Sequence, residues 1–259
     1  MAEKSEIDGL FESFVFAPVE TQTVFEATLA RLTTAIKLGL LAPGTRLPSE
    51  ADLAVRLGIS RATLREAIRS LQQSSLLESR RGRTGGSYIL ETRRQATRDE
   101  ALRLSGQLGQ RLFECLDLRA VLEPASAEFA ARRSDEFSKG VLRTLLEHSH
   151  QAPSSFRRAD ARLHVAIGLM SGVPALAVSI AQVQADLDEL IALIPTFDVS
   201  VRRSHQQHES IIDAICDGDA VAARSLVQTH VDAMTTLINN FVVGEEAETA
   251  GGTPVTLPS

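Results

Sequence analysis

The chain has 259 residues, which is enough for one large domain or two ordinary ones. Its hydrophobic content is 44%, but only 4% of the residues are aromatic, a composition that suits a core of packed helices better than a β-sandwich. Neither a secretion signal nor an apolar stretch of about 20 residues is visible, so we expect a cytoplasmic protein with no membrane partner.

The charge is distributed unevenly along the chain. The formal net charge of −6 would by itself argue against nucleic-acid binding. Between Arg56 and Arg94, however, nine arginines accompany three acids, a local balance of +6, whereas from Gln95 onward 14 basic and 22 acidic residues leave −8. This asymmetry predicts two regions with different roles, of which the first suits nucleic acid.

The N-terminal part begins with a weakly patterned stretch, and we expect residues 1–19 to be poorly ordered. Over residues 21–40 apolar residues recur at steps of three and four, which predicts a helix with one buried face. The pair Pro43-Gly44 ends this helix, because proline and glycine both interrupt helical hydrogen bonding.

Two short helices follow, separated by a very tight turn. Ser49 is suited to cap the first of them, and Gly58 to end it in the left-handed conformation that glycine accepts. Ser60 caps the next helix, predicted over residues 61–73. The polar side of this second helix presents Arg61, Thr63, Arg65 and Arg69. A tight helix pair with arginines at the start of its second helix suits entry into the major groove of DNA.

A β-hairpin is predicted after the helix pair. Residues 76–80 and 87–90 have the pattern of two strands, and three glycines lie in the segment between them. Arg81 and Arg83 at this tip can reach phosphates or the adjacent minor groove. Helices and hairpin together predict a winged helix-turn-helix domain over residues 20–92.

This region resembles the DNA-binding domain of the GntR superfamily. The resemblance rests on the run from Gly44 to Glu50 (GTRLPSE) and on the run from Leu57 to Ala67 (LGISRATLREA). It implies that Arg61, Thr63 and Arg65 contact bases and phosphates, and that Gly82 enters the minor groove. The complete set of predicted DNA-binding residues is Arg46, Ser49, Ser60, Arg61, Thr63, Arg65, Arg69, Arg81, Gly82 and Arg83.

The match has two departures. Ala51 stands where the family usually has an arginine that touches DNA, so one anchoring contact is in doubt. Ser74-Ser75 replaces the Glu-Gly that usually precedes the first strand of the wing. We therefore expect an operator that differs from the common pattern.

From residue 97 to 242 the pattern is helical without strand-like alternation. Predicted breaks lie near Gly109, Ser134, Pro153, 172–174, Pro195 and Gly218. They divide the region into six or seven helices, and we expect an all-helical bundle with its own core and cavity. The polar, Gly- and Pro-containing stretch 243–259 predicts a disordered tail. Cys115 and Cys216 lie among apolar residues and are expected to be buried thiols.

Candidate metal ligands stand out within this helical region. Asp160 and His164 are four residues apart and project from one face of a helix, while His208 and His230 fall on two later helices. His205 shares the neighbourhood of His208. One Asp with three His suits Zn²⁺, Ni²⁺, Mn²⁺ or Fe²⁺ better than Ca²⁺ or Mg²⁺. The residues alone leave open that each His is an ordinary surface or core side chain.

The same region is similar to the ligand-sensing FCD domain of FadR-type GntR regulators. The segments that carry this resemblance are Leu118–Pro124, Asp160 with His164, and 208–230. It implies that Asp160, His164, His208 and His230 hold a divalent metal, with zinc favoured, and that open coordination positions receive a carboxylate effector. It also implies that His205 is a pocket-edge or surface residue rather than a ligand.

Arg119 lies within the first of these segments. By the resemblance it is an effector-binding residue that pairs with a carboxylate. The alternative is a structural ion pair with an acid near the ligands.

Three functions follow from these expectations. The first is a homodimeric repressor that binds a palindromic double-stranded operator and responds to a small carboxylate. The second is a metalloenzyme, for which a general base is missing, because Glu209 points about 100° away from its neighbour His208. The third is a regulator whose metal is purely structural. The sequence favours the first, so we expect no enzymatic activity.

Overall fold

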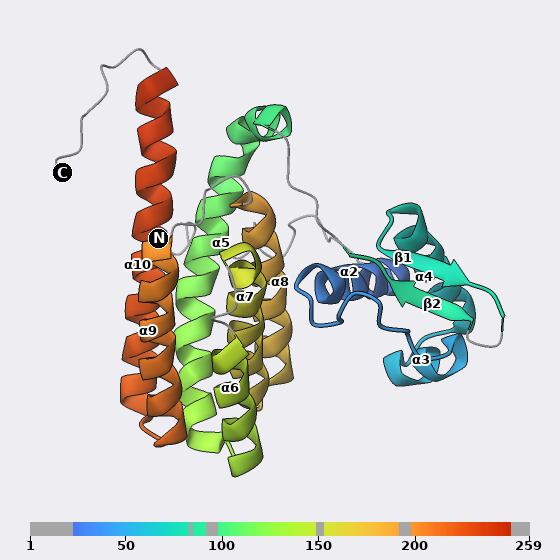
Figure 1. The fold of residues 1–259 in the computed structure, drawn as a ribbon, viewed down its shortest axis with the longest axis horizontal. Helices are drawn as coiled ribbons and strands as arrows, with labels where there is room; N and C mark the ends of the chain where they lie inside the picture. The colour runs from blue at the N-terminus through green and yellow to red at the C-terminus, as the bar shows by residue number, and fades with distance from the viewer. Residues whose placement is uncertain (1–22, 83–84, 92–97, 149–152, 192–197, 250–259) are drawn as a thin grey trace, which may run out of the picture. The chain divides into compact units, whose positions relative to one another are not determined.

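The computed structural model describes residues 23–82, 85–91, 98–148, 153–191 and 198–249. The chain divides into two compact units, one made of the residues up to Thr33 with 44–90, the other of 34–43 with the residues from Glu91 on. Figure 1 shows helices and a small hairpin in the first unit and long helices side by side in the second. The mainly α fold class predicted from the sequence is confirmed.

Within residues 23–82 and 85–90 the chain forms three helices and two strands. Their bounds are α2 Val24–Lys37, α3 Glu50–Leu57, α4 Arg61–Gln73, β1 Leu77–Arg80 and β2 Gly86–Ile89. The core under α4 consists of its own apolar face, where Leu64 is fully buried and Leu71 is 1% exposed, together with residues of α3 and the hairpin. This face fixes which side of α4 is left to the solvent.

Local hydrogen bonds fix where α3 and α4 begin. The hydroxyl of Ser49 accepts from the backbone N–H of Asp52 at 3.2 Å, and that of Ser60 accepts from the N–H of Thr63 at 3.0 Å. Gly58 ends α3 at φ +67°, a conformation that costs a residue with a Cβ considerably more. The predicted caps and stop are therefore found at the predicted positions.

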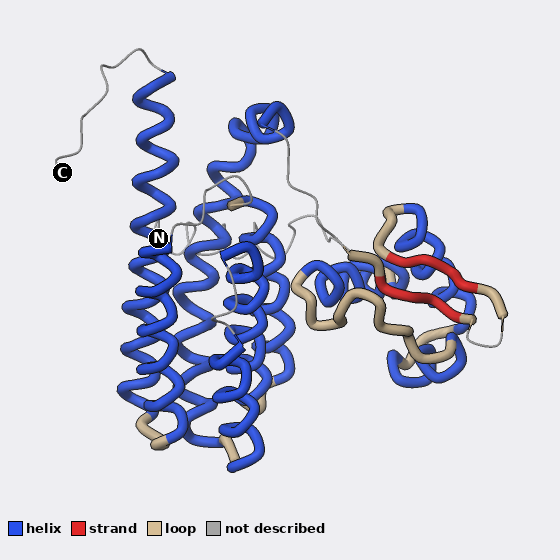
Figure 2. Tube along the Cα trace, in the orientation of Figure 1, coloured by secondary structure: helices blue, strands red, loops and turns tan. Residues whose placement is uncertain are grey.

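The hairpin is a regular antiparallel pair, drawn in red in Figure 2. Leu77 pairs with Ile89 at its base and Arg80 with Gly86 near its tip. A single bridge joins Arg46 to Tyr88 and so attaches the segment before α3 to the edge of the hairpin. This is the wing that the sequence predicted.

Six helices make up the described part of the second region. Their bounds are α5 Arg98–Arg133, α6 Glu136–His148, α7 Pro153–Met170, α8 Pro174–Leu190, α9 Asp198–Cys216 and α10 Ala220–Thr249. α5 packs against α7, α8, α9 and α10, and α9 packs against α10 (Figure 1). The main core lies among these helices and is built from Ala, Leu, Ile and Val, as the shortage of aromatics required.

Two boundary predictions for this region are wrong. α5 runs through Gly109 without the predicted break, because one glycine costs a helix only about 1 kcal/mol and neighbouring contacts can supply that. α10 continues to Thr249, past the predicted start of the disordered tail at residue 243, through a stretch rich in the good helix formers Glu and Ala. The predicted segment 1–19 and the remainder of the predicted tail 243–259, from residue 250 on, lie outside the described residues.

Both cysteines are buried, as predicted. Cys115 is 6% and Cys216 is 8% exposed. The thiol of Cys115 donates to the carbonyl of Val183 at 3.3 Å, and burial raises its pKa to about 11. Within the described ranges, none of the helices combines the length and apolarity needed to cross a bilayer.

Candidate functional site

Three helices of the second unit bring four predicted ligands together. Asp160 and His164 come from α7, His208 from α9 and His230 from α10. One ligand atom from each lies within 4.8 Å of those of the other three, and all four residues are buried. We call these residues the Asp/His cluster. A tetrahedral ion with metal–nitrogen distances of about 2.1 Å needs ligand atoms roughly 3.4 Å apart, so small side-chain rotations suffice.

The chemistry of the cluster fits a metal for a second reason. His208 is 1% exposed, and neither of its ring nitrogens has a hydrogen-bond partner. Its Nε2 lies 3.4 Å from Oδ1 of Asp160. A buried polar atom without a partner is costly, and a bound metal would satisfy the one ring nitrogen of His208 that carries the lone pair.

Two neighbouring side chains orient the other histidines. Nδ1 of His164 lies 3.0 Å from Oε2 of Glu123, and Nδ1 of His230 lies 3.1 Å from Oε1 of Gln207. Because carboxylate and amide oxygens only accept, each Nδ1 carries the proton and each Nε2 keeps its lone pair. Both Nε2 atoms thereby have the protonation state of a metal ligand, although an Nη of Arg119 lies 3.1 Å from Nε2 of His164 and would have to move aside for an ion.

Arg119 lies beside the cluster and is 1% exposed. Its Nε is 3.0 Å from both carboxylate oxygens of Glu123, and one Nη is 3.1 Å from Nε2 of His164. The other Nη has no hydrogen-bond partner. Arg119 therefore forms a structural ion pair with Glu123, which was the alternative to its role in effector binding, and one of its Nη donors remains unsatisfied.

Burial and charge shift the pKa values of this site. Burial lowers the pKa of His208 to about 4 and that of His230 well below its usual value, which keeps both rings neutral. For Glu123 burial alone would raise the pKa, but the Arg119 guanidinium and His164 outweigh it and lower the pKa to about 2. The network thus holds a carboxylate paired with a guanidinium beside neutral imidazoles.

His205 does not join the four predicted ligands. Its Nε2 lies 3.1 Å from Oε1 of Glu209, one turn along α9. Its side chain is buried rather than at the surface, at 8% exposure for the residue. Glu209, the one general base weighed from the sequence, is paired with His205 and about half exposed.

Sequence reasoning missed three residues of the site, Glu123, Gln184 and Gln207. The amide of Gln184 donates to Oε1 of Glu123 at 2.6 Å and completes the shell around that carboxylate. Glu123 had a signal in the sequence, since it lies four residues after Arg119 on one helix and such pairs meet. The two glutamines had none, because an isolated helical glutamine is usually a surface residue.

The predicted DNA-binding side chains of α4 lie on its exposed side. Arg61 and Arg69 are exposed, and Thr63 is half-buried beside the Ser60 hydroxyl, 2.8 Å from its own. Nε of Arg65 lies 3.1 Å from Oε2 of Glu50 on α3, and its side chain remains 56% exposed. This pair uses Nε of Arg65, so the two terminal nitrogens of the guanidinium remain at the surface, where they could contact DNA.

The wing and the segment before α3 carry the remaining predicted positions. Arg46, Ser49 and Arg81 are exposed, and Gly82 has φ +103°, which favours glycine at the tip. Arg83 lies outside the described residues. Ala51, the departure from the family pattern, is half-buried at the start of α3.

Comparison with known proteins gives the following matches. The sequence model of bacterial regulatory proteins of the gntR family matches residues 25–86, and that of the FCD domain matches 114–233. The HTH-type transcriptional regulator RmpR of Mycobacterium gastri is 26% identical over 258 residues, which are 96% of this chain and 92% of the relative.

Two relatives from Escherichia coli are similar over most of their length. The L-lactate dehydrogenase operon regulatory protein is 30% identical over 227 residues, 78% of this chain and 81% of the relative. The galactonate operon transcriptional repressor is 27% identical over 207 residues, 76% of this chain and 89% of the relative.

Proposed function

The chain belongs to the GntR family of bacterial regulatory proteins and carries the FCD domain, and from this premise we propose that it is a transcriptional repressor controlled by a carboxylate at a buried metal centre. The resemblance inferred from the sequence is thereby confirmed. Family and relatives are transcriptional regulators rather than enzymes, which removes the support for a metalloenzyme.

DNA binding is assigned to the winged helix over residues 20–92. The exposed side of α4 would enter the major groove with Arg61, Thr63 and Arg65, and Gly82 at the wing tip would approach the minor groove. A cytoplasmic homodimer would place two such helices on the half-sites of a palindromic operator. The exposed arginines of α4 support this assignment.

The metal is assigned to the Asp/His cluster, in the proposed domain 97–242. The carrying observation is that four buried ligands converge where His208 has no other partner. Three nitrogens and one carboxylate oxygen suit zinc, with nickel, manganese or iron as alternatives. When bound, the ion supplies a Lewis-acid position at which a carboxylate oxygen can bind.

Charge at the site favours an anionic effector. Arg119 and Glu123 compensate each other, and a divalent cation with the carboxylate of Asp160 leaves one positive charge in a buried place. Buried net charge is expensive, so a monocarboxylate would neutralise it. The unsatisfied Nη of Arg119 is a donor for such a ligand. Two relatives are named for operons of L-lactate and galactonate, which are both hydroxycarboxylates.

The test combines metal content with a ligand screen. Full-length protein is analysed for bound metal, then metal-loaded and metal-free samples are melted with a panel of small carboxylates. We expect about one metal per chain. We also expect one acid that raises Tm only in the metal-loaded protein; at 100 times its Kd, this acid should increase the free energy of unfolding by about 2.7 kcal/mol. The same acid should change the affinity for operator DNA.

The controls separate the competing outcomes. His208→Ala should lose the metal, while His205→Ala, three residues away on the same helix, should keep it. Metal binding with no stabilising acid would indicate a regulator whose metal is purely structural. Equal metal content in both variants would contradict the assigned centre.

A further inference from the structure

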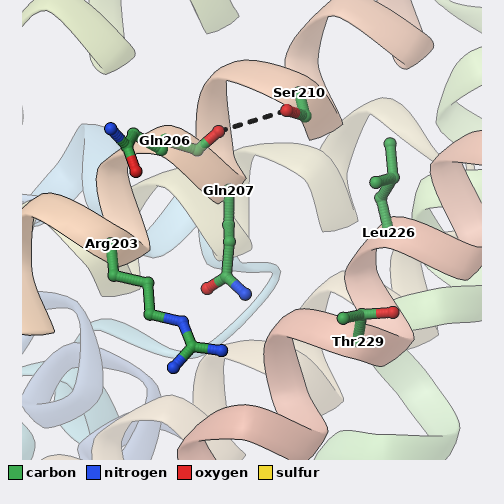
Figure 3. A pocket seen from close by; sticks show the side chains of 6 residues that line it. All are labelled: Arg203, Gln206, Gln207, Ser210, Leu226 and Thr229. Carbon is green, nitrogen blue, oxygen red and sulfur yellow. Dashed lines mark hydrogen bonds between the residues drawn. The ribbon is translucent and has the colours of Figure 1, made fainter.

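A groove lies between α9 and α10, and of the residues assigned so far it shares only Gln207. It has a volume of about 310 Å³, at the small end of the roughly 300–1,000 Å³ of ligand sites. The side chains that line it are Arg203, Gln206, Gln207 and Ser210 of α9 and Leu226 and Thr229 of α10 (Figure 3). Five of these six side chains are polar, which suits a small polar ligand.

One end of the groove offers hydrogen-bond donors and a positive charge. Arg203 is exposed, and among the described residues no carboxylate pairs with its guanidinium. Figure 3 shows Arg203 and Gln207 extending from α9 toward the same side. Since the lining contains no acid, this end attracts an anion.

The hydroxyl groups of the groove have the opposite character. Ser210 donates to the backbone carbonyl of Gln206 at 3.2 Å, as Figure 3 shows, and Thr229 donates to that of Ser225 at 3.0 Å. With their protons used, both oxygens are left as acceptors. A ligand that fits the whole groove therefore carries an anionic group for Arg203 and hydroxyl donors for Ser210 and Thr229.

Gln207 connects this groove to the buried cluster. Its Oε1 accepts from Nδ1 of His230 at 3.1 Å, so its Nε2 remains for a ligand in the groove. A ligand that pulls on this amide changes the bond that orients His230. The hydrogen bond at Nδ1 of His230 also sets the basicity of Nε2, the nitrogen that would bind the metal. A ligand in the groove can therefore affect the cluster through the side chain of Gln207.

We propose that the groove between α9 and α10 is a second binding site, for a small hydroxylated carboxylate or phosphate, and that its occupancy reaches the Asp/His cluster through Gln207. The link to the cluster rests on the proposed metal centre. Binding of the anion does not, and it is tested in protein without metal.

The first experiment measures anion binding calorimetrically in metal-free, full-length protein. D-Glycerate and glycerol 3-phosphate represent the carboxylate and phosphate sources, while propionate lacks the hydroxyls and glycerol lacks the charge. We expect at least one hydroxylated anion to bind about tenfold more tightly than propionate and glycerol. Arg203→Ala should weaken that binding about tenfold, because a hydrogen-bonded ion pair is lost.

Arg202→Ala is the matched control, since Arg202 is the neighbouring exposed arginine and does not line the groove. It should leave the affinity unchanged. Equal losses of anion affinity in the two variants would mean that only the net charge of the protein matters, and would overturn the proposed site. The absence of binding by either hydroxylated anion up to about 20 mM, well above the millimolar Kd that a weak site would give, would overturn it as well.

The second experiment tests the link to the cluster. The Kd of zinc is measured by competition with a chromophoric chelator, with and without the saturating anion, in the wild type and in Arg203→Ala. We expect a shift of about fivefold in the wild type and none in the variant. Equal shifts in both would mean chelation in solution or binding at the cluster, and would overturn the link. A chain that binds no zinc refutes the proposed metal centre and leaves the first experiment valid.

Discussion

Glu123→Gln is the change that most directly tests the buried polar network. The carboxylate of Glu123 accepts hydrogen bonds from three side chains, those of Arg119, His164 and Gln184. A glutamine of the same size offers one acceptor oxygen and adds two N–H donors. At least one of the three donors would lose its partner, and Arg119 would lose its counter-charge.

The magnitude follows from burial. Arg119 is 1% and Glu123 is 2% exposed, so solvent cannot replace the lost partner. Removing one member of a buried ion pair costs about 3–5 kcal/mol, and we expect that loss in the unfolding free energy of the metal-free protein. His164 would also lose the acceptor that fixes its tautomer, so metal affinity should fall by about 10- to 100-fold.

Urea unfolding of a double-mutant cycle provides the assay. Arg119→Met combined with Glu123→Gln removes both members of the ion pair together, so the double variant should lose less stability than the sum of the single ones. Glu128→Gln is the control on the same helix, because Glu128 pairs with the exposed Arg132 and Arg224, and it should cost at most about 1 kcal/mol. An additive cycle, or a loss below about 1 kcal/mol for Glu123→Gln, would refute the reasoning.

Three further predictions concern the cluster and the DNA-binding helix. His208→Ala should show no rise in Tm with metal, whereas metal at 1,000 times its Kd should stabilise the wild type by about 4 kcal/mol. Without metal, burial lowers the pKa of His208 to about 4 and also lowers that of His230, so the unfolded state binds more protons below about pH 6.5. The free energy of unfolding should therefore fall as the pH drops from about 6.5 toward 4, by roughly 3 kcal/mol for His208 alone. Urea midpoints that rise over this pH range would contradict the prediction. Arg65→Ala should weaken operator binding about tenfold and leave the circular dichroism spectrum unchanged. Arg132→Ala on α5 is the control and should leave operator binding unchanged. Equal binding by the two variants would argue against α4 as the recognition helix.

Local chemistry made the helix-turn-helix predictable. Ser49 and Ser60 each cap a helix through a backbone N–H three residues away, and Gly58 adopts its left-handed conformation without distant help. All the atoms involved are close in the sequence, so residue types and spacing suffice. The break expected at Gly109 failed for the complementary reason, since packing can carry a helix past a weak local signal.

The cluster was predictable in part. Four-residue spacing places Asp160 and His164 on one face of α7, but periodicity does not say that His208 and His230 face them. That expectation came from the family resemblance. The packing of α5, α7, α9 and α10 brings the four residues together, and no local pattern encodes which helices meet.

The order of the elements, the caps and stop of the DNA-binding helices, and the residue types available to a metal could thus all be predicted before the fold was known. The side chains that surround these ligands depend instead on how the helices pack. Gln184 reaches Glu123 across 61 residues of chain, and Gln207 reaches His230 across 23. Such contacts depend on how helices cross and on which rotamers fit between them. For that reason the shell of the cluster, and the groove that shares Gln207 with it, became visible only in the folded chain.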